Sequence, residues 1–197
     1  MRLVLASGNA GKVIELEQLL ADSDVHLVAQ TQLGVSDAEE TGLTFVENAL
    51  IKARHAARAT GMPALADDSG ICVDALGGAP GLYAARYAGT HGDSAANNAK
   101  LLRELDGIPS ERRQAYFIAV LVVLRHADDP APLIAEGRWH GRILDAPRGN
   151  GGFGYDPLFL PDGYDVSAAE LDPALKNRLS HRGQALAILQ QRFAELA

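Results

Sequence analysis

Apolar residues near the start of the chain follow two different periodicities, one after the other. Residues 2–6 form a short apolar run, which stops at the turn-forming residues 7–9. From Lys12 onward the apolar residues recur at helical spacing, as Val13, Leu16 and Leu20. A strand, a glycine loop and a helix in this order predict an α/β fold.

The rest of the chain repeats this alternation. Thr44 and Glu47 form a capping-box sequence that opens a second helix, and Gly61 followed by Pro63 closes it. We expect the last helix to begin at about Ser180. Strand patterns cover residues 26–30, 63–66, 114–125 and 133–142. The last two of these strands are long and joined by a polar turn, so the expected sheet is mixed rather than purely parallel.

The length and charge of the chain limit its class. A chain of 197 residues with 47% hydrophobic residues is expected to form one globular domain, residues 1–197. The lone Cys72 excludes an internal disulfide framework. A net charge of −7 argues against binding to nucleic-acid polymers or membrane surfaces, and the longest apolar stretch, residues 117–124, is too short to cross a bilayer. We therefore expect a soluble, cytoplasmic protein.

The residues between the first strand and the first helix are suited to phosphate binding. Small residues leave backbone N–H groups accessible, and the N-terminus of a helix carries a partial positive charge. Lys12 adds a full charge. The spacing differs from that of a P-loop, which has four residues between its glycines and a Ser or Thr after the lysine. An ordinary strand-to-helix turn is the alternative interpretation.

Two acidic doublets are candidates for a metal site. Glu39 and Glu40 form one doublet and Asp67 and Asp68 the other, and each is expected in a loop that follows a strand. Carboxylate oxygens suit Mg²⁺, which binds through one or two carboxylates together with substrate phosphates. A solvated turn is the alternative for the first doublet. It is a weaker alternative for the second, which directly follows an apolar strand.

Three further groups complete the candidates. Lys52 on the second helix is either a surface lysine or a cation for phosphate. Residues 151–157 put aromatic rings among glycines, which suits either nucleobase stacking or a hairpin turn with core aromatics. Lys176 precedes a basic group at the start of the last helix, where Arg182 could bind a phosphate and His181 could hydrogen-bond a base.

Each motif alone is modest, whereas their combination is specific. The motifs are Ser-Gly-Asn-x-x-Lys at 7–12, Glu-Glu-Thr-Gly-x-Thr-Phe-x-Glu-Asn-Ala-x-x-Lys-Ala at 39–53, Ala-Asp-Asp-Ser-Gly at 66–70, Gly-Gly-Phe-Gly-Tyr-Asp-Pro at 151–157 and Ser-His-Arg at 180–182. In this order, and over nearly the whole chain, they closely resemble the inosine triphosphatase family. Members of that family are XTP/dITP pyrophosphatases that act on non-standard purine nucleotides.

The resemblance implies a fold and a reaction. The implied fold is a long mixed β-sheet flanked by helices, with two lobes around a central nucleotide-binding cleft, usually in a homodimer. The implied reaction is the Mg²⁺-dependent hydrolysis of purine nucleoside triphosphates such as ITP, dITP and XTP. Its products are the monophosphate and pyrophosphate, and it removes these nucleotides from the nucleotide pool.

The resemblance also implies roles for individual residues. Asp68 would be the catalytic residue that orients or deprotonates the attacking water, and Glu40 and Asp68 would hold Mg²⁺. The substrate-binding residues would be Ser7, Gly8, Asn9, Ala10, Gly11, Lys12, Lys52, Ser69, Phe153, Gly154, Tyr155, Asp156, Lys176, His181 and Arg182. Phe153 would stack on the base. Hydrogen-bonding groups, with Asp156 and His181 among the candidates, would select a 6-oxo purine.

Overall fold

The computed structural model describes residues 1–196, and Ala197, the last residue of the expected domain, lies outside the described residues. The chain divides into two compact units. Unit 1 consists of Met1–Asp68, Ala119–Gly137 and His181–Ala197, and unit 2 of Ser69–Ile118 and Arg138–Ser180. That residues 1–197 act as one domain stays a prediction.

Within residues 1–196 six strands form one sheet, in the order β2-β1-β3-β4-β5-β6. The strands are β1 (Arg2–Ala6), β2 (His26–Ala29), β3 (Ala64–Val73), β4 (Gln114–Leu124), β5 (Leu133–Ile143) and β6 (Phe159–Pro161). Strand β1 pairs in parallel with β2 and β3, whereas β5 and β6 are antiparallel. The predicted mixed α/β sheet is therefore confirmed.

Five α-helices lie within residues 1–196. They are α1 (Ala10–Leu19), α2 (Phe45–Thr60), α3 (Ser94–Glu104), α4 (Pro173–Leu179) and α5 (His181–Gln190). Helix α1 starts two residues before Lys12, because Asn9 caps it. Helix α4 was not predicted, and it begins at Pro173, because proline is well suited to the first helical position. Helix α5 begins at His181, next to the predicted start at Ser180, and ends at Gln190. Within residues 1–196, no helix is long and apolar enough to cross a membrane.

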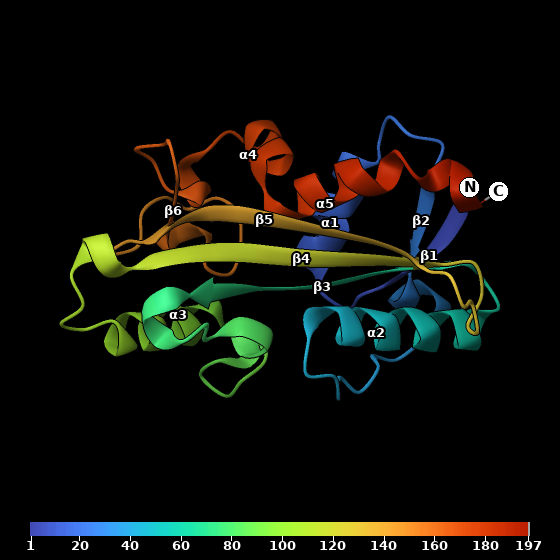
Figure 1. Ribbon diagram of the computed structural model, residues 1–197, viewed down its shortest axis with the longest axis horizontal. Coiled ribbons are helices and arrows are strands. Elements are labelled where there is room, and N and C mark those ends of the chain that lie inside the picture. Colours follow the sequence, from blue (N-terminus) through green and yellow to red (C-terminus); the bar gives the residue numbers. More distant parts are fainter. Residues whose placement is uncertain (197) are drawn as a thin grey trace. The chain divides into compact units, whose positions relative to one another are not determined.

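Unit 1 packs helices on both faces of its strands. Successive side chains of a strand point to opposite faces, so Leu3 and Leu5 of β1 join the core beneath α1 and α5, and Val4 and Ala6 join the core beneath α2. Figure 1 shows α2 on one face and α1 with α5 on the other. This alternation decides which helix each polar side chain of a strand meets.

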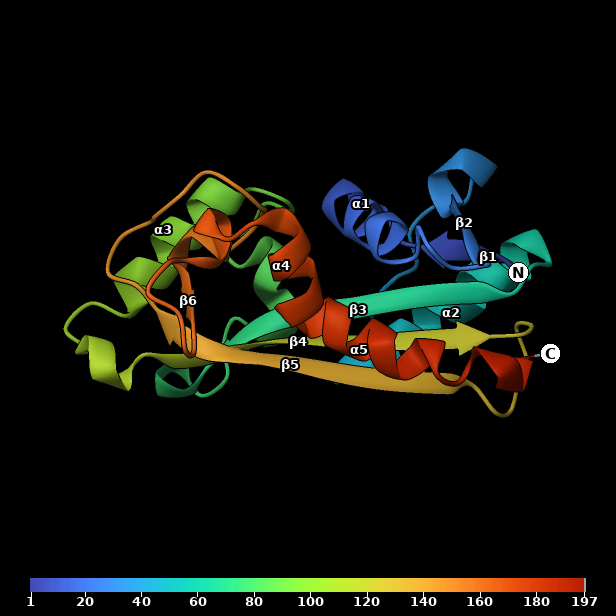
Figure 2. The same ribbon diagram turned by 90° about the horizontal axis from the view of Figure 1, so that it is seen from above.

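Helix α5 lies along the unit 1 part of β5 (Figure 2). Gly137 of β5 makes this close approach possible, since a Cβ there would be 2.1 Å from the backbone oxygen of His181 and 2.7 Å from the amide nitrogen of Ala185. Both are backbone atoms and cannot move aside independently. A bare backbone at Gly137 therefore fixes where the first turn of α5, which carries Arg182, packs on the sheet.

Unit 2 has its own apolar core, which is rich in aromatic residues. The ring of Phe159 lies 4.7 Å from that of Phe117 and 5.2 Å from that of Trp139, measured between centroids. Tyr155 and Leu158 are buried in the same core. The glycine-rich segment that precedes them is thus attached to a packed scaffold at its C-terminal end.

Candidate functional site

Asp67 and Asp68 lie in the middle of β3, and the prediction that they lie in a loop was wrong. The strand continues without interruption from Ala64 to Val73, and both aspartates are buried. The sequence Asp-Asp-Ser-Gly is typical of a turn, but hydrogen bonding within the sheet overrides that preference. Because adjacent strand residues face opposite sides, the two carboxylates meet different helices.

Asp67 faces α1 and α5 and is shared between two cations. Its Oδ1 lies 2.8 Å from the Lys12 ammonium, and its Oδ2 accepts a hydrogen bond of 2.7 Å from Nε of Arg182. The guanidinium of Arg182 also donates from Nη1 to the carboxylate of Glu15 on α1. We call these four residues the Asp67 cluster. Asp67 and Arg182 are each 1% exposed, so their charges are stabilised by neighbouring charges and hardly by solvent.

The titration of the Asp67 cluster follows from this pairing. Burial alone would raise the pKa of Asp67, but Arg182 and Lys12 outweigh burial and hold that pKa well below its usual range. For Lys12, burial dominates and lowers the pKa, although Asp67 offsets part of the effect. Burial would also lower the pKa of Arg182, but Asp67 and Glu15 raise it. Asp67 and Arg182 therefore stay charged.

The residues that precede α1 form a tight cap rather than an open loop. The side-chain oxygen of Asn9 accepts the backbone N–H of Lys12 at 3.1 Å, and the Ser7 hydroxyl oxygen accepts the N–H of Asn9 at 3.2 Å. A Cβ on Gly8 would lie 2.8 Å from a carboxylate oxygen of Asp37, so this segment is also confined from outside. Lys12 consequently sits in the first turn of α1, where its charge adds to that of the helix N-terminus.

Asp68 faces α2 and meets Lys52 at the middle of that helix. The Lys52 ammonium lies 2.5 Å from Oδ1 of Asp68 and 3.1 Å from Oε1 of Glu40. Lys52 is thus not a surface lysine, because its side chain is only 12% exposed. We call Asp68, Lys52 and Glu40 the Asp68 cluster. It brings together the two residues predicted to hold a metal and one predicted to bind phosphate.

A glycine turn at the start of α2 positions Glu40. The N–H of Gly42 donates to the side-chain oxygen of Asn48 at 2.8 Å, and a Cβ on Gly42 would lie 2.6 Å from the Cβ of Glu47. Thr44 caps the helix as predicted, since its hydroxyl oxygen accepts the N–H of Glu47. The segment carrying Glu40 is therefore fixed against the first turn of α2.

Burial and the charges within the Asp68 cluster together shift the pKa values of Asp68 and Lys52. Burial raises the pKa of Asp68, an effect that Lys52 opposes and the nearby Glu40 carboxylate reinforces. Burial would lower the pKa of Lys52, but Asp68 and Glu40 together raise it. Lys12 feels the charges of both Lys52 and Asp68 as well. The charges of the two clusters therefore influence one another.

Glu40 and Asp68 together fit a hard divalent cation. Their oxygens already converge on one cation, the Lys52 ammonium. Among the described residues no group of three or more His, Cys, Asp or Glu side chains could hold a metal. Two carboxylates are nevertheless enough for Mg²⁺, which keeps several water ligands and takes others from substrate phosphates. Such an ion would take the place of the Lys52 ammonium beside the two carboxylates.

In unit 2, Asp156 organises the glycine-rich segment. Its Oδ2 accepts the backbone N–H of Phe153 at 2.8 Å and is 2.6 Å from the Lys176 ammonium. Gly152 has φ of +68°, and a Cβ there would come within 2.1 Å of the Asp156 carboxylate. Only glycine allows this turn, so Gly152 and Asp156 together determine where the Phe153 ring projects.

Phe153 is the exposed aromatic residue of this segment. Phe153 is 36% exposed, and the Lys176 ammonium lies 5.3 Å from the centroid of its ring. Tyr155 is instead buried, and its hydroxyl donates to the backbone oxygen of Ala84. We therefore find one accessible ring and one core ring. Core packing is therefore confirmed for Tyr155, whereas stacking of Phe153 on a base stays a prediction.

The remaining predicted residues lie near these groups in the chain. Ser69 follows Asp68 in β3, Gly154 lies between Phe153 and Tyr155, and His181 is buried at the start of α5. The predicted contact of Arg182 with phosphate stays a prediction, because its guanidinium faces two carboxylates.

Two further residues make positioning contacts that were not predicted from the sequence. One is Glu15, which the helical spacing marks only as a polar residue of α1. The other is Asn98, whose side-chain N–H donates to the backbone oxygen of Gly154 at 3.0 Å and whose own oxygen is buried without a hydrogen-bond partner. No local motif marks either residue, since each depends on a contact between distant segments.

Comparison with known proteins identifies a family. A family model described as the Ham1 family matches residues 3–192. A dITP/XTP pyrophosphatase of Xanthomonas campestris pv. campestris is 66% identical over 195 residues, 99% of this chain and 98% of that protein. A dITP/XTP pyrophosphatase of Thioalkalivibrio sulfidiphilus is 59% identical, with 98% of each chain covered.

Solved structures give the same result. A HAM1 protein from Coxiella burnetii is 49% identical, with a TM-score of 0.90 and 99% of each chain covered. The Staphylococcus aureus Ham1 protein is 36% identical, with a TM-score of 0.86 and complete coverage of both chains. These matches confirm the resemblance predicted from the motifs. With the family model matching almost the whole sequence, the chain belongs to the Ham1 family.

Proposed function

We propose that this chain hydrolyses non-standard purine nucleoside triphosphates, namely ITP, dITP and XTP, to the monophosphate and pyrophosphate. The predicted enzyme class, a nucleoside triphosphate pyrophosphatase, is confirmed by the names of the relatives. The observation that carries the finer proposal is the Asp68 cluster, in which a buried strand carboxylate, a lysine and a second carboxylate converge within 2.5–3.1 Å.

In the proposed reaction a water oxygen forms a new bond to phosphorus as the bridge between the α- and β-phosphates breaks. Asp68 accepts the proton of the attacking water, and pyrophosphate leaves with the bridging electron pair when the α-phosphorus is attacked. Lys52 and Lys12 neutralise phosphate charge from two sides of β3. Phosphoryl transfer requires mainly positioning and charge stabilisation, which these residues supply.

Glu40 and Asp68 are the residues that would hold Mg²⁺. When bound, the ion would supply charge neutralisation and Lewis-acid polarisation at the phosphate oxygens. The chain's own contribution is to keep two carboxylates together at a site where a cation offsets their repulsion. We expect the substrate to be a free nucleotide and not a nucleic-acid polymer, and a homodimer remains part of the proposal.

Phosphorus NMR of products tests the reaction type. The protein is incubated with ITP and Mg²⁺ in ¹⁸O-labelled water, with ATP and GTP as comparison substrates. The proposal requires IMP and pyrophosphate, with the label showing which phosphorus is attacked. Release of orthophosphate would identify an NTPase that cleaves the γ-phosphate, and absence of turnover despite binding would identify a nucleotide-binding module.

Phe153 offers a test of base recognition. Stacking on an aromatic ring contributes about 1–3 kcal/mol per base and does not depend on the 6-substituent. We expect Phe153→Ala to lower kcat/KM for ITP and XTP alike, by roughly tenfold to a hundredfold. Loss confined to one base would contradict stacking and assign Phe153 to selective recognition.

A further inference from the structure

Glu15 is a buried acid that none of the predicted roles uses. It lies on α1, is 8% exposed, and its carboxylate accepts from Nη1 of Arg182. Three residues earlier on the same helix, Lys12 binds Asp67, which in turn binds Arg182. The contacts therefore form a closed chain from Glu15 through Arg182 and Asp67 to Lys12, which begins and ends on α1.

We propose that Glu15 is a positioning residue that holds the Lys12 ammonium in place for the substrate's phosphates, acting through Arg182 and Asp67. The proposal rests on the proposed function, because it assigns a role to Lys12 in phosphate binding. It adds a residue outside every motif recognised in the sequence.

The geometry of Asp67 explains how Glu15 can act over this distance. The two carboxylate oxygens are divided, with Oδ1 on Lys12 and Oδ2 on Nε of Arg182. A guanidinium prefers to bind a carboxylate through two parallel N–H groups. Glu15 holds Nη1 and so fixes the orientation in which Nε of Arg182 donates to a single oxygen of Asp67. Without Glu15, the guanidinium can turn so that Nη1 and Nη2 bind both oxygens of Asp67, and Lys12 then loses its anchor.

Charge balance gives the same direction. The Asp67 cluster contains two cations and two anions, and buried charges are stable only when they are paired. Without the negative charge of Glu15, the positive charge of Arg182 depends more strongly on Asp67 for neutralisation. Arg182 is 1% exposed, so water cannot replace the missing partner. Asp67 is then drawn toward Arg182 and away from Lys12.

This mechanism predicts an effect opposite to that of simple electrostatics. Glu15→Gln removes one negative charge near an anion site, which by itself would strengthen anion binding. Loss of the Lys12 anchor would weaken it. We therefore expect Glu15→Gln to bind inorganic tripolyphosphate about tenfold more weakly than the unchanged protein, measured by calorimetry in EDTA. We also expect KM for the nucleotide to rise more than kcat falls.

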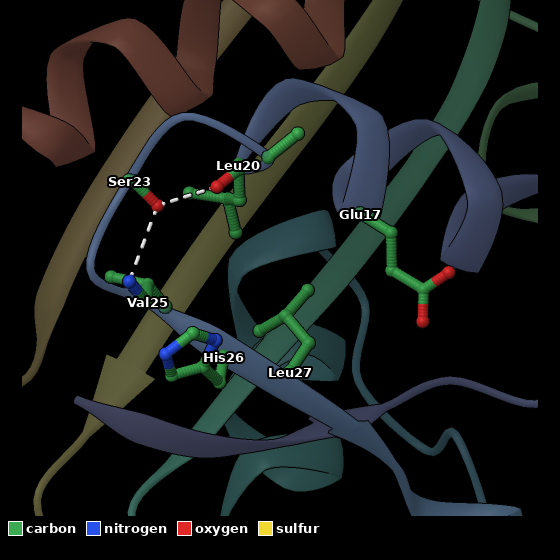
Figure 3. Close-up of a pocket in the computed structure, with 7 residues that line it drawn as sticks. Glu17, Leu20, Ser23, Val25, His26 and Leu27 are labelled. Carbon is green, nitrogen blue, oxygen red and sulfur yellow. Dashed lines mark hydrogen bonds between the residues drawn. The ribbon is translucent and has the colours of Figure 1, made fainter.

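Glu17 provides the matched control. It lies two residues further along α1, is exposed, and lines a shallow surface pocket of about 200 Å³ with Leu20 and Ser23 (Figure 3). Glu17→Gln makes the same change in charge on the same helix without touching the Asp67 cluster. We expect its affinity for tripolyphosphate to equal that of the unchanged protein within twofold.

A double-mutant cycle separates positioning from general structural damage. If Glu15 acts through Lys12, then Glu15→Gln has no further weakening effect in a Lys12→Ala background. If Glu15→Gln does not fold, Glu15→Asp against Glu17→Asp replaces the comparison. Glu15→Asp keeps the charge but shortens the reach, and we expect affinity between those of the unchanged protein and Glu15→Gln.

The outcomes are distinct. Weaker tripolyphosphate binding by Glu15→Gln that disappears in the Lys12→Ala background supports the proposal. Equal or tighter binding, or an equal weakening in both backgrounds, overturns it and leaves the proposed function intact. If the unchanged protein itself does not bind tripolyphosphate, the phosphate-binding role of Lys12 fails and this proposal with it, whereas the products formed from ITP still decide the proposed function.

Discussion

Asp67 and Asp68 are neighbours of the same residue type in one strand, yet their surroundings differ in charge and exposure. The Asp67 cluster pairs two acids with two bases and is almost wholly buried. The Asp68 cluster pairs two acids with one base, and the Glu40 side chain in it is 26% exposed. The first cluster is neutral and closed, whereas the second carries one net negative charge and is open to solvent.

The difference teaches how a single strand can serve two purposes. A closed, neutral set of buried charges holds three elements, β3, α1 and α5, in one arrangement, and any change of charge within it is costly. An open set with one excess negative charge can accept a cation together with its ligands. Strand alternation separates the two clusters by directing neighbouring side chains to opposite faces.

The largest expected effect separates the two aspartates by activity. Asp68→Asn removes the proton acceptor and a proposed metal ligand, so we expect kcat to fall at least about 10³-fold while nucleotide binding persists. Steady-state kinetics and equilibrium binding of ITP measure the two quantities. Turnover close to that of the unchanged protein would remove Asp68 from its catalytic role.

For the free energy of unfolding we expect the opposite order, with the larger loss in Asp67→Asn and the smaller in Asp68→Asn. Asp67→Asn leaves Arg182 and Lys12 without their shared carboxylate, and breaking a buried ion pair in this manner costs about 3–5 kcal/mol of unfolding free energy. Urea denaturation measures this loss, and Asp22→Asn at an exposed position serves as the control. A smaller loss for Asp67→Asn than for Asp68→Asn would contradict the distinction between the clusters.

The pH dependence of this stability follows from the direction of the shift. The pKa of Asp67 is lower in the folded protein than in the unfolded chain, where an aspartate titrates near pH 3.9. Its contribution is therefore fully present above that pH and is lost as the pH falls toward the lowered value. We expect the difference in unfolding free energy between the unchanged protein and Asp67→Asn to be constant from about pH 5 to 8 and to shrink in stronger acid.

A smaller effect is expected from Lys52. Lys52→Ala removes a charge-assisted contact that contributes about 1.5–3 kcal/mol, so we expect kcat/KM to fall roughly tenfold to a hundredfold. Arg54→Ala removes the same charge from an exposed position of α2 and should leave kcat/KM unchanged. Equal kcat/KM values for the two variants would show that Lys52 has no role in the reaction.

Most of the secondary structure was predictable because its signals are local. The Thr44 cap, the closing Gly61 and the two long strands occur where the sequence indicated. The errors lie where a tertiary contact overrides a local preference. Residues 67–70 resemble a turn, but they continue β3.

The candidate site divides in the same way. The motifs identified Lys12, Lys52, Asp68 and Glu40, and the structure brings the last three into contact. Arg182 was predicted as a ligand for phosphate, although its guanidinium is buried against Asp67 and Glu15. A basic residue beside a helix N-terminus cannot reveal its partner from sequence, because that partner is more than a hundred residues away.

The sequence by itself determined the fold class, the enzyme family and most of the residues proposed for the candidate site. It could do so because caps, turns and motif order are local properties of the chain. Only the tertiary structure decided which of two adjacent aspartates pairs with Arg182 and which with Lys52. That choice depends on the direction in which each side chain leaves β3 and on the helix packed against that face.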